Sequence, residues 1–267
     1  MSKSTSPALA VEIAYMVGHS TDVRSSAGKL LQSRSLDNLS KARVSRVLGS
    51  LLRDEGEFSD ALARFRAALE FLEGEDAPVE LAQVCCCLLE SECDSVEFDG
   101  SRATALQTRR AALRTGEPIV LATTHHTFGR LEARFGNLDR ALRHFAMARE
   151  TIAASSNLFL KAAVDLDEAS TRSLSGEFSE SLRLSESAFS TATICGWSKG
   201  VVAAAANCAF FLVILGNYDE ARKYLAIAES HAFRSPSYEL AILETRAQLA
   251  LAEGDLLRAE ELLQARG

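Results

Sequence analysis

The sequence has few prolines, no long apolar run and no excess of basic residues, and each absence excludes a class of protein. Only 4 of the 267 residues are proline, which suits long uninterrupted helices. The longest apolar stretch, Val201–Leu215, contains Asn207 and is too short to cross a bilayer. The net charge of -7 argues against general binding to a phosphate backbone, which needs a basic face. We therefore expect a helical protein with no membrane partner, and nucleic acid is not the expected partner.

Segments that direct export, catalysis or cofactor binding are also missing. The N-terminal Met1–Pro7 is short and polar, and Glu12 interrupts the apolar residues after it, so no signal peptide is expected. We accordingly place the chain in the cytoplasm. No nucleophile motif, glycine-rich phosphate loop or HExxH pattern is present. We expect no enzyme activity, no cofactor and no metal.

The cysteines, histidines and acidic runs do not combine into a metal or catalytic site. Cys85, Cys86 and Cys87 are neighbours on a predicted helix and point about 100° apart, so we interpret them as buried reduced thiols. His125 and His126 open a predicted helix with no third ligand one turn later, and we expect one in the core and one on the inner face. The acidic runs are interpreted as solvated helix ends. They comprise Glu73, Glu75, Asp76, Asp165, Asp167 and Glu168.

What the sequence does contain is a tripeptide that recurs at nearly constant spacing. Glycine, any residue and then Phe, Tyr or Leu begin at Gly56, Gly136, Gly176, Gly216 and Gly254. Subtracting neighbouring positions gives 80, 40, 40 and 38, so the first interval is expected to hide one degenerate copy near Val96. A period of about 40 residues predicts a solenoid of repeated units.

Each copy follows the same residue pattern around its glycine. The first copy consists of Leu48, Gly49, Gly56, Phe58, Ala61, Phe65 and Ala68. The turn glycine can take the left-handed conformation that ends one helix, and the next residue, Asn137, Asn217 or Asp255 in later copies, can cap the helix that follows. The alanine five residues after the glycine falls where two antiparallel helices cross, and the bulky residue one turn later fills the space beside it.

These residues at these intervals resemble the tetratricopeptide repeat (TPR) family over roughly Lys41–Gly267. The resemblance implies an all-α fold, a right-handed α-α superhelix or solenoid of stacked antiparallel helix pairs. The period exceeds the family's usual 34 residues, which we interpret as about one extra turn distributed between the two helices of each pair. HEAT and armadillo repeats have periods near 40 but lack this residue pattern, and they are the alternative fold.

The predicted domain organisation is one continuous array. Residues 1–37 are expected to form a tail and an introductory helical hairpin, Ala8–Arg34, with its turn near Gly18–Thr21. Residues 38–267 are expected to form about six TPR-like pairs. Their predicted ranges are Asn38–Glu73, Pro78–Thr115, Pro118–Ser155, Leu158–Cys195, Ser198–Ala232 and Pro236–Arg266. Three of them begin with a proline, at the position where its missing N–H costs nothing.

The resemblance also implies where a ligand binds, because the first helix of each TPR pair lines the concave groove. Its exposed positions on this chain are Arg43, Arg46, Ser50, Arg53, Gln83, Glu90, His126, Arg130, Arg134, Phe210, Asp167, Ser170 and Asn207. Five of these are arginines in the N-terminal half, and guanidinium groups suit carboxylate or phosphate. The alternative is that the arginines only keep an exposed helix soluble or pair with local carboxylates.

The expected function is a non-catalytic scaffold, or the sensory arm of a regulator, that binds an acidic or amphipathic protein or peptide segment in the groove. The alternatives are an RNA-binding helical-repeat protein and an enzyme with an unrecognised helical active site. The final helix carries Leu256, Leu257, Leu262 and Leu263 with no following helix to cover them all. We therefore expect either self-association through the C-terminal helix pair or a longer polypeptide that continues the stack. The alternative is that these leucines pack on their own partner helix.

Overall fold

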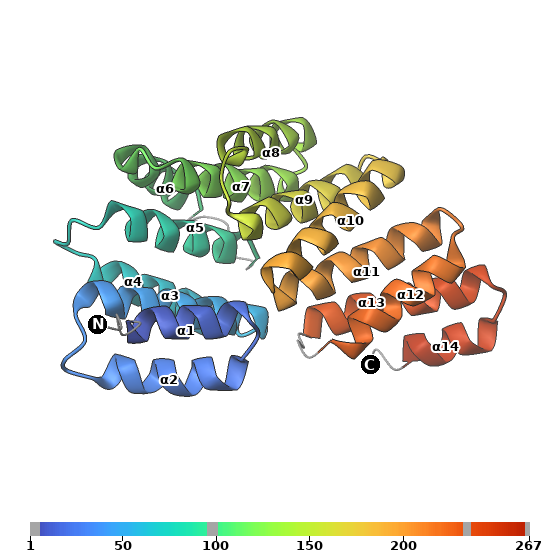
Figure 1. Cartoon of the computed structure of the whole chain (residues 1–267), viewed down its shortest axis with the longest axis horizontal. Helices are drawn as coiled ribbons and strands as arrows, with labels where there is room; N and C mark the ends of the chain where they lie inside the picture. The colour runs from blue at the N-terminus through green and yellow to red at the C-terminus, as the bar shows by residue number, and fades with distance from the viewer. Residues whose placement is uncertain (1–5, 95–100, 232–235, 265–267) are drawn as a thin grey trace. The chain divides into compact units, whose positions relative to one another are not determined.

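The computed structural model describes residues 6–94, 101–231 and 236–264, and these residues form fourteen α-helices and no strand (Figure 1). The helices follow one another as antiparallel pairs joined by short turns, which confirms the predicted all-α arrangement of helix pairs. The chain divides into two compact units, Met1–Ser156 and Asn157–Gly267. The single continuous array of helix pairs stays a prediction.

Unit 1 begins with the expected hairpin and continues with three pairs. The hairpin consists of α1 (Pro7–Met16) and α2 (Ser20–Gln32). The three pairs are α3 (Asn38–Asp54) with α4 (Phe58–Phe71), α5 (Pro78–Asp94) with α6 (Ser101–Thr115), and α7 (Pro118–Arg134) with α8 (Leu138–Ile152). Each first helix packs on its own second helix and on the first helix of the next pair, so α1, α3, α5 and α7 form one layer.

Unit 2 repeats the arrangement with three further pairs. They are α9 (Leu158–Ser173) with α10 (Phe178–Cys195), α11 (Ser198–Ile214) with α12 (Tyr218–Ser230), and α13 (Pro236–Ala252) with α14 (Leu256–Gln264). The first helices are again neighbours, because α11 packs on both α9 and α13. The longest apolar stretch of the sequence, Val201–Leu215, lies in α11 and its C-cap, and most side chains of α11 are buried.

The helix boundaries agree with the predicted pairs to within a few residues. Pro78, Pro118 and Pro236 each begin a first helix, as expected. Pro7 also begins a helix, α1, although the sequence analysis assigned it to the tail. The degenerate copy near Val96 and the end of the last pair at Arg266 lie outside the described residues.

The five turn glycines all have the left-handed backbone that the repeat pattern predicted. Their φ angles are +83° at Gly56, +77° at Gly136, +78° at Gly176, +80° at Gly216 and +82° at Gly254. A side chain is strained in this conformation, so the glycine fixes where each first helix ends.

The capping prediction is correct at only one of its three positions. Asp255 accepts a hydrogen bond from the Arg258 N–H at 3.0 Å. The Asn137 and Asn217 side chains make no cap hydrogen bond. The Asn137 amide instead donates to Glu132 Oε2 at 2.8 Å, because this carboxylate on the preceding helix competes for it.

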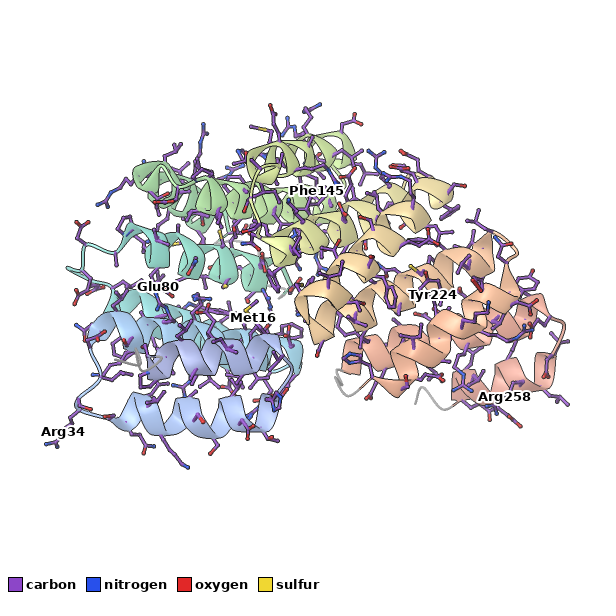
Figure 2. All side chains as sticks on the ribbon, viewed as in Figure 1. Met16, Arg34, Glu80, Phe145, Tyr224 and Arg258 are labelled. Atoms are coloured by element: carbon purple, nitrogen blue, oxygen red, sulfur yellow. The ribbon has the colours of Figure 1, made fainter. Side chains whose placement is uncertain are left out.

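The small residues of the pattern allow close packing inside each pair. Ala61, Ala141 and Ala221 are fully buried at the helix crossings, as predicted. A Cβ placed on Gly129 would lie 2.5 Å from the ring of Phe145, which is completely buried (Figure 2). Gly49 has the same relation to Phe65, at 2.7 Å. Glycine at this position is therefore what lets the aromatic ring reach the first helix.

The leucines of α14 divide between buried and exposed positions. Leu262 packs into the last pair and is 7% exposed, whereas Leu256 and Leu257 are 69% and 78% exposed. Leu263 is 47% exposed. The expected apolar surface is thus present on α14 as described, and self-association through it stays a prediction.

Candidate functional site

The first helices of unit 1 are joined by ion pairs, and the most deeply buried carboxylate is Glu80 of α5 (Figure 2). Glu80 is 3% exposed and accepts hydrogen bonds from Arg43 Nε at 3.2 Å and Arg46 Nε at 2.7 Å, both from α3. Arg46 also donates through Nη2 to Glu12 of α1 at 2.8 Å. One arginine therefore connects three consecutive first helices.

A second carboxylate, Glu90, lies near the other end of α5 and also joins neighbouring first helices. Its Oε2 receives Arg53 Nη1 of α3 at 2.7 Å and lies 2.7 Å from Arg130 Nη1 of α7. Its Oε1 accepts a hydrogen bond from the Thr127 hydroxyl at 3.0 Å. Burial alone would raise the pKa of Glu90, but Arg130 and Arg53 outweigh it and hold that pKa well below its usual range.

We refer to these residues together as the arginine–glutamate ladder. Its members are Glu12, Arg43, Arg46, Arg53, Glu80, Glu90 and Arg130. Several contacts in this layer join residues 37 positions apart, namely Arg43 to Glu80, Arg53 to Glu90, and Glu90 to Thr127. The offset of 37 recurs at two successive joints because the first helices pack there with the same stagger, so the ladder is a property of the joints between pairs.

The ladder has an inner and an outer arginine at each of its two α5 glutamates, Glu80 and Glu90. Arg46 and Arg53 are only 11% and 13% exposed, whereas Arg43 and Arg130 are 33% and 32% exposed. The inner arginine neutralises the buried carboxylate, and the outer arginine adds a further positive charge that reaches solvent. These four arginines were predicted as exposed ligand-binding positions, and the structure shows each of them paired with a local carboxylate, which was the alternative.

The other predicted binding residues are more dispersed. Ser50 and His126 are buried at 6% and 8% exposure, so the expectation that they are exposed is wrong. Both point toward neighbouring helices, Ser50 to Cys87 of α5 and His126 to the ring of Phe145. Their side chains therefore contribute to packing between helices.

Gln83, Arg134 and Phe210 complete the predicted set. Gln83 is half-buried on α5, and Arg134 is exposed at the end of α7 with no ion pair to any described residue. Phe210 lies on α11 of unit 2, where it packs against the buried Phe211. Asp167, Ser170 and Asn207 are also in unit 2, on α9 and α11. The ladder thus brings together five of the thirteen predicted residues: Arg43, Arg46, Arg53, Glu90 and Arg130.

Two histidines meet between the helices of the third pair. His125 and His126 lie in the middle of α7, not at its start as expected. His125 Nδ1 is 3.1 Å from His144 Nδ1 of α8, and burial together with nearby positive groups lowers the pKa of both imidazoles. Within the described residues, no group of three or more potential metal ligands is found.

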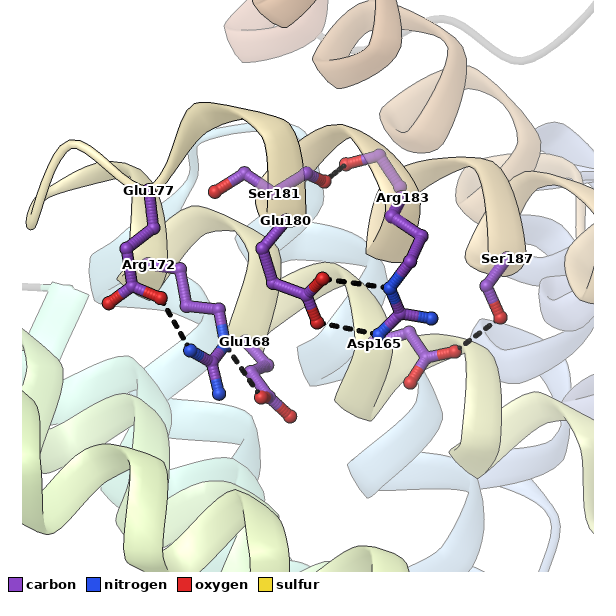
Figure 3. Close-up of polar contacts among 9 residues, drawn as sticks. Asp165, Glu168, Arg172, Glu177, Glu180, Ser181, Arg183 and Ser187 are labelled. Carbon is purple, nitrogen blue, oxygen red and sulfur yellow. Dashed lines mark hydrogen bonds and ion pairs between the residues drawn. The ribbon is translucent and has the colours of Figure 1, made fainter.

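The acidic run on α9 does not form a solvated helix end. Asp165 and Glu168 are buried in the middle of α9, where α10 covers them (Figure 3). Asp165 accepts a hydrogen bond from the Ser187 hydroxyl at 2.8 Å, and Glu168 accepts one from Arg172 Nε at 2.9 Å. The interpretation is wrong here because the sequence did not show which face α10 covers. Glu73, Glu75 and Asp76 are exposed, as predicted.

The clustered cysteines are small core residues, as expected. Cys85 and Cys86 are buried free thiols, and Cys87 is partly buried. Burial raises the pKa of Cys85 to about 12, so this thiol stays protonated.

No helix in the described part of the chain is both long and apolar enough to traverse a bilayer.

Comparison with known proteins identifies the fold but not a family. No family model matches the sequence, and no curated protein matches it. Among solved structures, the Rap protein complexed with Competence and Sporulation Factor has a TM-score of 0.74 and 16% identity, over 96% of this chain and 72% of its own. BtubC (BKLC) from P. vanneervenii has a TM-score of 0.59 and 15% identity, over 80% of this chain and 88% of its own.

A third similar structure is a signal transduction ATPase with numerous domains from Pyrococcus horikoshii that has a tetratricopeptide repeat sensor. It has a TM-score of 0.60 and 15% identity, over 96% of this chain and 40% of its own. The chain therefore spans less than half of that protein. These similarities show that the fold is of the TPR-like helical-repeat kind.

Proposed function

We propose that this chain is a non-catalytic protein-binding module, a long-helix TPR variant with a period near 40 residues, that holds an acidic segment of a protein partner along the first helices of unit 1. The observation that carries the proposal is the ladder, in which every buried glutamate is shared by two arginines. The fold supports it, since a similar structure is a Rap protein complexed with Competence and Sporulation Factor and another has a TPR sensor.

The chemistry of recognition follows from the outer arginines. The ladder contains four arginines and three glutamates, so it carries one excess positive charge in a partly buried layer. The guanidinium groups of Arg43 and Arg130 reach solvent while one edge of each is held by a buried carboxylate. A held guanidinium loses less conformational freedom when a partner's carboxylate binds, and its planar fork matches that group.

The ladder also decides which substitutions can test the proposal. Arg46 and Arg53 are nearly buried beside Glu80 and Glu90, so reversing either charge would set two carboxylates against each other in this layer and destabilise the fold. Arg43→Gln with Arg130→Gln removes only the outer guanidinium groups. Arg64→Gln, at an exposed position on α4, is the matched control for loss of positive charge.

The experiment is affinity capture followed by direct titration. Partners captured by the whole chain are identified by mass spectrometry, and their acidic segments are made as peptides and titrated against the wild type and the variants. We expect the double variant to bind at least one such peptide on the order of tenfold more weakly, with the Arg64→Gln control unchanged. Equal binding of every captured segment to wild type and double variant would refute the assignment. A titration with RNA at several salt concentrations tests the nucleic-acid alternative.

A further inference from the structure

Helix α6 of unit 1, whose place is shown in Figure 1, buries small side chains and exposes large apolar ones, the opposite of the usual amphipathic arrangement. Its buried side chains are all small: Ser101, Thr104, Thr108, Ala111 and Ala112. Its two large apolar side chains, Leu106 and Leu113, are instead 52% and 64% exposed. A helix of a globular protein normally turns such leucines inward. Their exposure on one helix therefore calls for a functional explanation.

The same helix carries a concentrated positive charge. It contains four arginines and no acidic residue, and the arginines are Arg102, Arg109, Arg110 and Arg114. All four are exposed, and the ion pair found for them among the described residues is a loose one between Arg114 and Asp76 at 3.7 Å. The other second helices, α4, α8, α10, α12 and α14, each mix acidic and basic residues.

The leucines and three of the arginines share one face. Each helical residue turns by about 100°, so Leu106 and Leu113, seven positions apart, point in nearly the same direction. By the same geometry Arg102, Arg109 and Arg110 lie within about 60° of them, on both sides. We call these five residues the α6 outer face.

The two helices that pack against α6, α5 and α7, do not neutralise this charge. Helix α7 carries one carboxylate, Glu132, which accepts a hydrogen bond from Asn137 at 2.8 Å and lies 4.0 Å from Arg140. Helix α5 carries four acidic residues and no basic one, but Glu80 and Glu90 are held by arginines of α3 and α7. Glu92 is 6% exposed, and a hydrogen bond from Thr104 of α6 to it opposes the rise in its pKa that burial causes. Glu80 and Glu90 thus serve the ladder, Glu92 is buried against α6, and the four arginines of α6 are exposed.

We propose that the α6 outer face is a second docking surface, which binds an acidic amphipathic helix of a protein partner. The two leucines contact apolar side chains of that helix one or two turns apart, and the flanking arginines pair with its carboxylates. This surface lies on a second helix, whereas the ladder lies on first helices, so the two proposals stand or fall separately.

Charge and shape favour a protein partner over a membrane or a nucleic acid. A helix that binds at a bilayer surface offers a broad apolar face, whereas here only two leucines stand among three arginines. Nucleic-acid backbones are bound by cations without apolar contacts, and the chain as a whole has a charge of -7. An acidic helix with spaced apolar side chains can contact the leucines of this face through its apolar residues and pair with the arginines through its carboxylates.

The experiment measures fluorescence anisotropy with the whole chain and three labelled helical peptides of roughly 18 residues, long enough to form a helix. The first peptide consists of Glu, Ala and Leu, with leucines seven positions apart on one face. The second has Ala in place of Leu, and the third has Lys in place of Glu. We expect the first to bind, the second to bind at least about tenfold more weakly, and the third not to bind.

Protein variants separate the α6 outer face from general stickiness. Arg109→Glu with Arg110→Glu, and separately Leu106→Ser with Leu113→Ser, should each weaken the first peptide by about tenfold or more. The control, Leu174→Ser with Ile194→Ser, removes two large apolar side chains of unit 2 that are 67% and 72% exposed and should change nothing. Circular dichroism of every variant establishes that the helices are retained.

Three results would overturn the proposal. The first is equal binding of the leucine-containing and leucine-free peptides, and the second is wild-type binding by both α6 variants. The third is α6-dependent binding to phosphatidylserine–phosphatidylcholine vesicles or to duplex RNA without binding to the first peptide. That result would assign the face to lipid or nucleic acid.

Discussion

Replacing Gly129 with alanine tests the closest contact in the core. Gly129 lies in the middle of α7, and a Cβ added there would lie 2.5, 2.7 and 2.9 Å from three ring atoms of Phe145. The Phe145 side chain is completely buried, so it has no free space into which to move. Gly28, in the middle of α2, is the matched control, because nothing lies within 4 Å of a Cβ built on it.

The expected magnitudes follow from two opposing effects. Alanine in place of glycine inside a helix stabilises by about 1 kcal/mol, and this gain applies at both positions. Overpacking a well-filled core costs about 1–3 kcal/mol, and this cost applies only at Gly129. Gly28→Ala should therefore stabilise by about 1 kcal/mol, whereas Gly129→Ala should range from neutral to about 2 kcal/mol destabilising. The difference between the two variants is the cost of the contact itself.

Urea unfolding followed by circular dichroism at constant pH measures both changes in the free energy of unfolding, with the denaturant slope as a check on cooperativity. A third variant, Gly129→Ala with Phe145→Leu, removes the ring and should lose most of the penalty. Equal shifts for Gly28→Ala and Gly129→Ala would refute the packing described here, because helix propensity alone would then account for both.

Three further predictions concern charge, protonation and thiol reactivity. Glu80→Leu should destabilise the fold by about 3–5 kcal/mol because it leaves Arg46 without its buried partner. Arg258→Ala, at an exposed ion pair, should change the free energy of unfolding by no more than about 0.5 kcal/mol. Thermal melts that coincide for the two variants would contradict the buried ladder. Burial lowers the pKa of both His125 and His144 from the ordinary value of 6.5, and the nearby Arg109 and His125 add to the effect at His125 and His144 respectively. The folded state therefore prefers the neutral imidazoles, and its stability should fall as the pH drops below 6.5. Urea midpoints at several pH values check this, and a variant with glutamine at both positions should lose that part of the pH dependence. Iodoacetamide at neutral pH should modify the exposed Cys195 long before the buried Cys85, as peptide mass spectrometry would show, and the reverse order would contradict the burial of the cysteine cluster.

The helix pairs could be predicted because glycine and proline have strong local conformational meaning. Gly56 and its equivalents end first helices with a left-handed residue, and Pro78 begins one, whatever surrounds them. Which side chains become partners depends instead on the stagger between neighbouring helices, and the repeat pattern of the sequence does not define that stagger. With the offset of 37 residues, Arg43 leads directly to Glu80, a ladder residue that the analysis missed.

Burial of polar and apolar side chains was the least predictable feature. Asp165 and Glu168 were expected in solvent and are buried, because a covering helix decides which face of α9 is accessible. Leu106 and Leu113 of α6 show the reverse, since a count of apolar residues gives no reason to place them outside. Both cases depend on contacts between helices, and a repeat pattern based on glycine, alanine and aromatic residues does not contain that information.

The alternation of arginine and glutamate between neighbouring first helices limits which helix pairs unit 1 could lose during evolution or in protein engineering. Helices α5 and α7 begin 40 residues apart, at Pro78 and Pro118, so an in-frame deletion of residues 78–117 would begin α7 at the position where α5 now begins. It would also set Arg130 in the place of Glu90, opposite Arg53, so that like charges met across the new joint. Helix pairs of the same shape are therefore not interchangeable, because each carries the charge that its neighbours require. Unit 1 cannot lose this helix pair unless a charged residue at the new joint also changes sign.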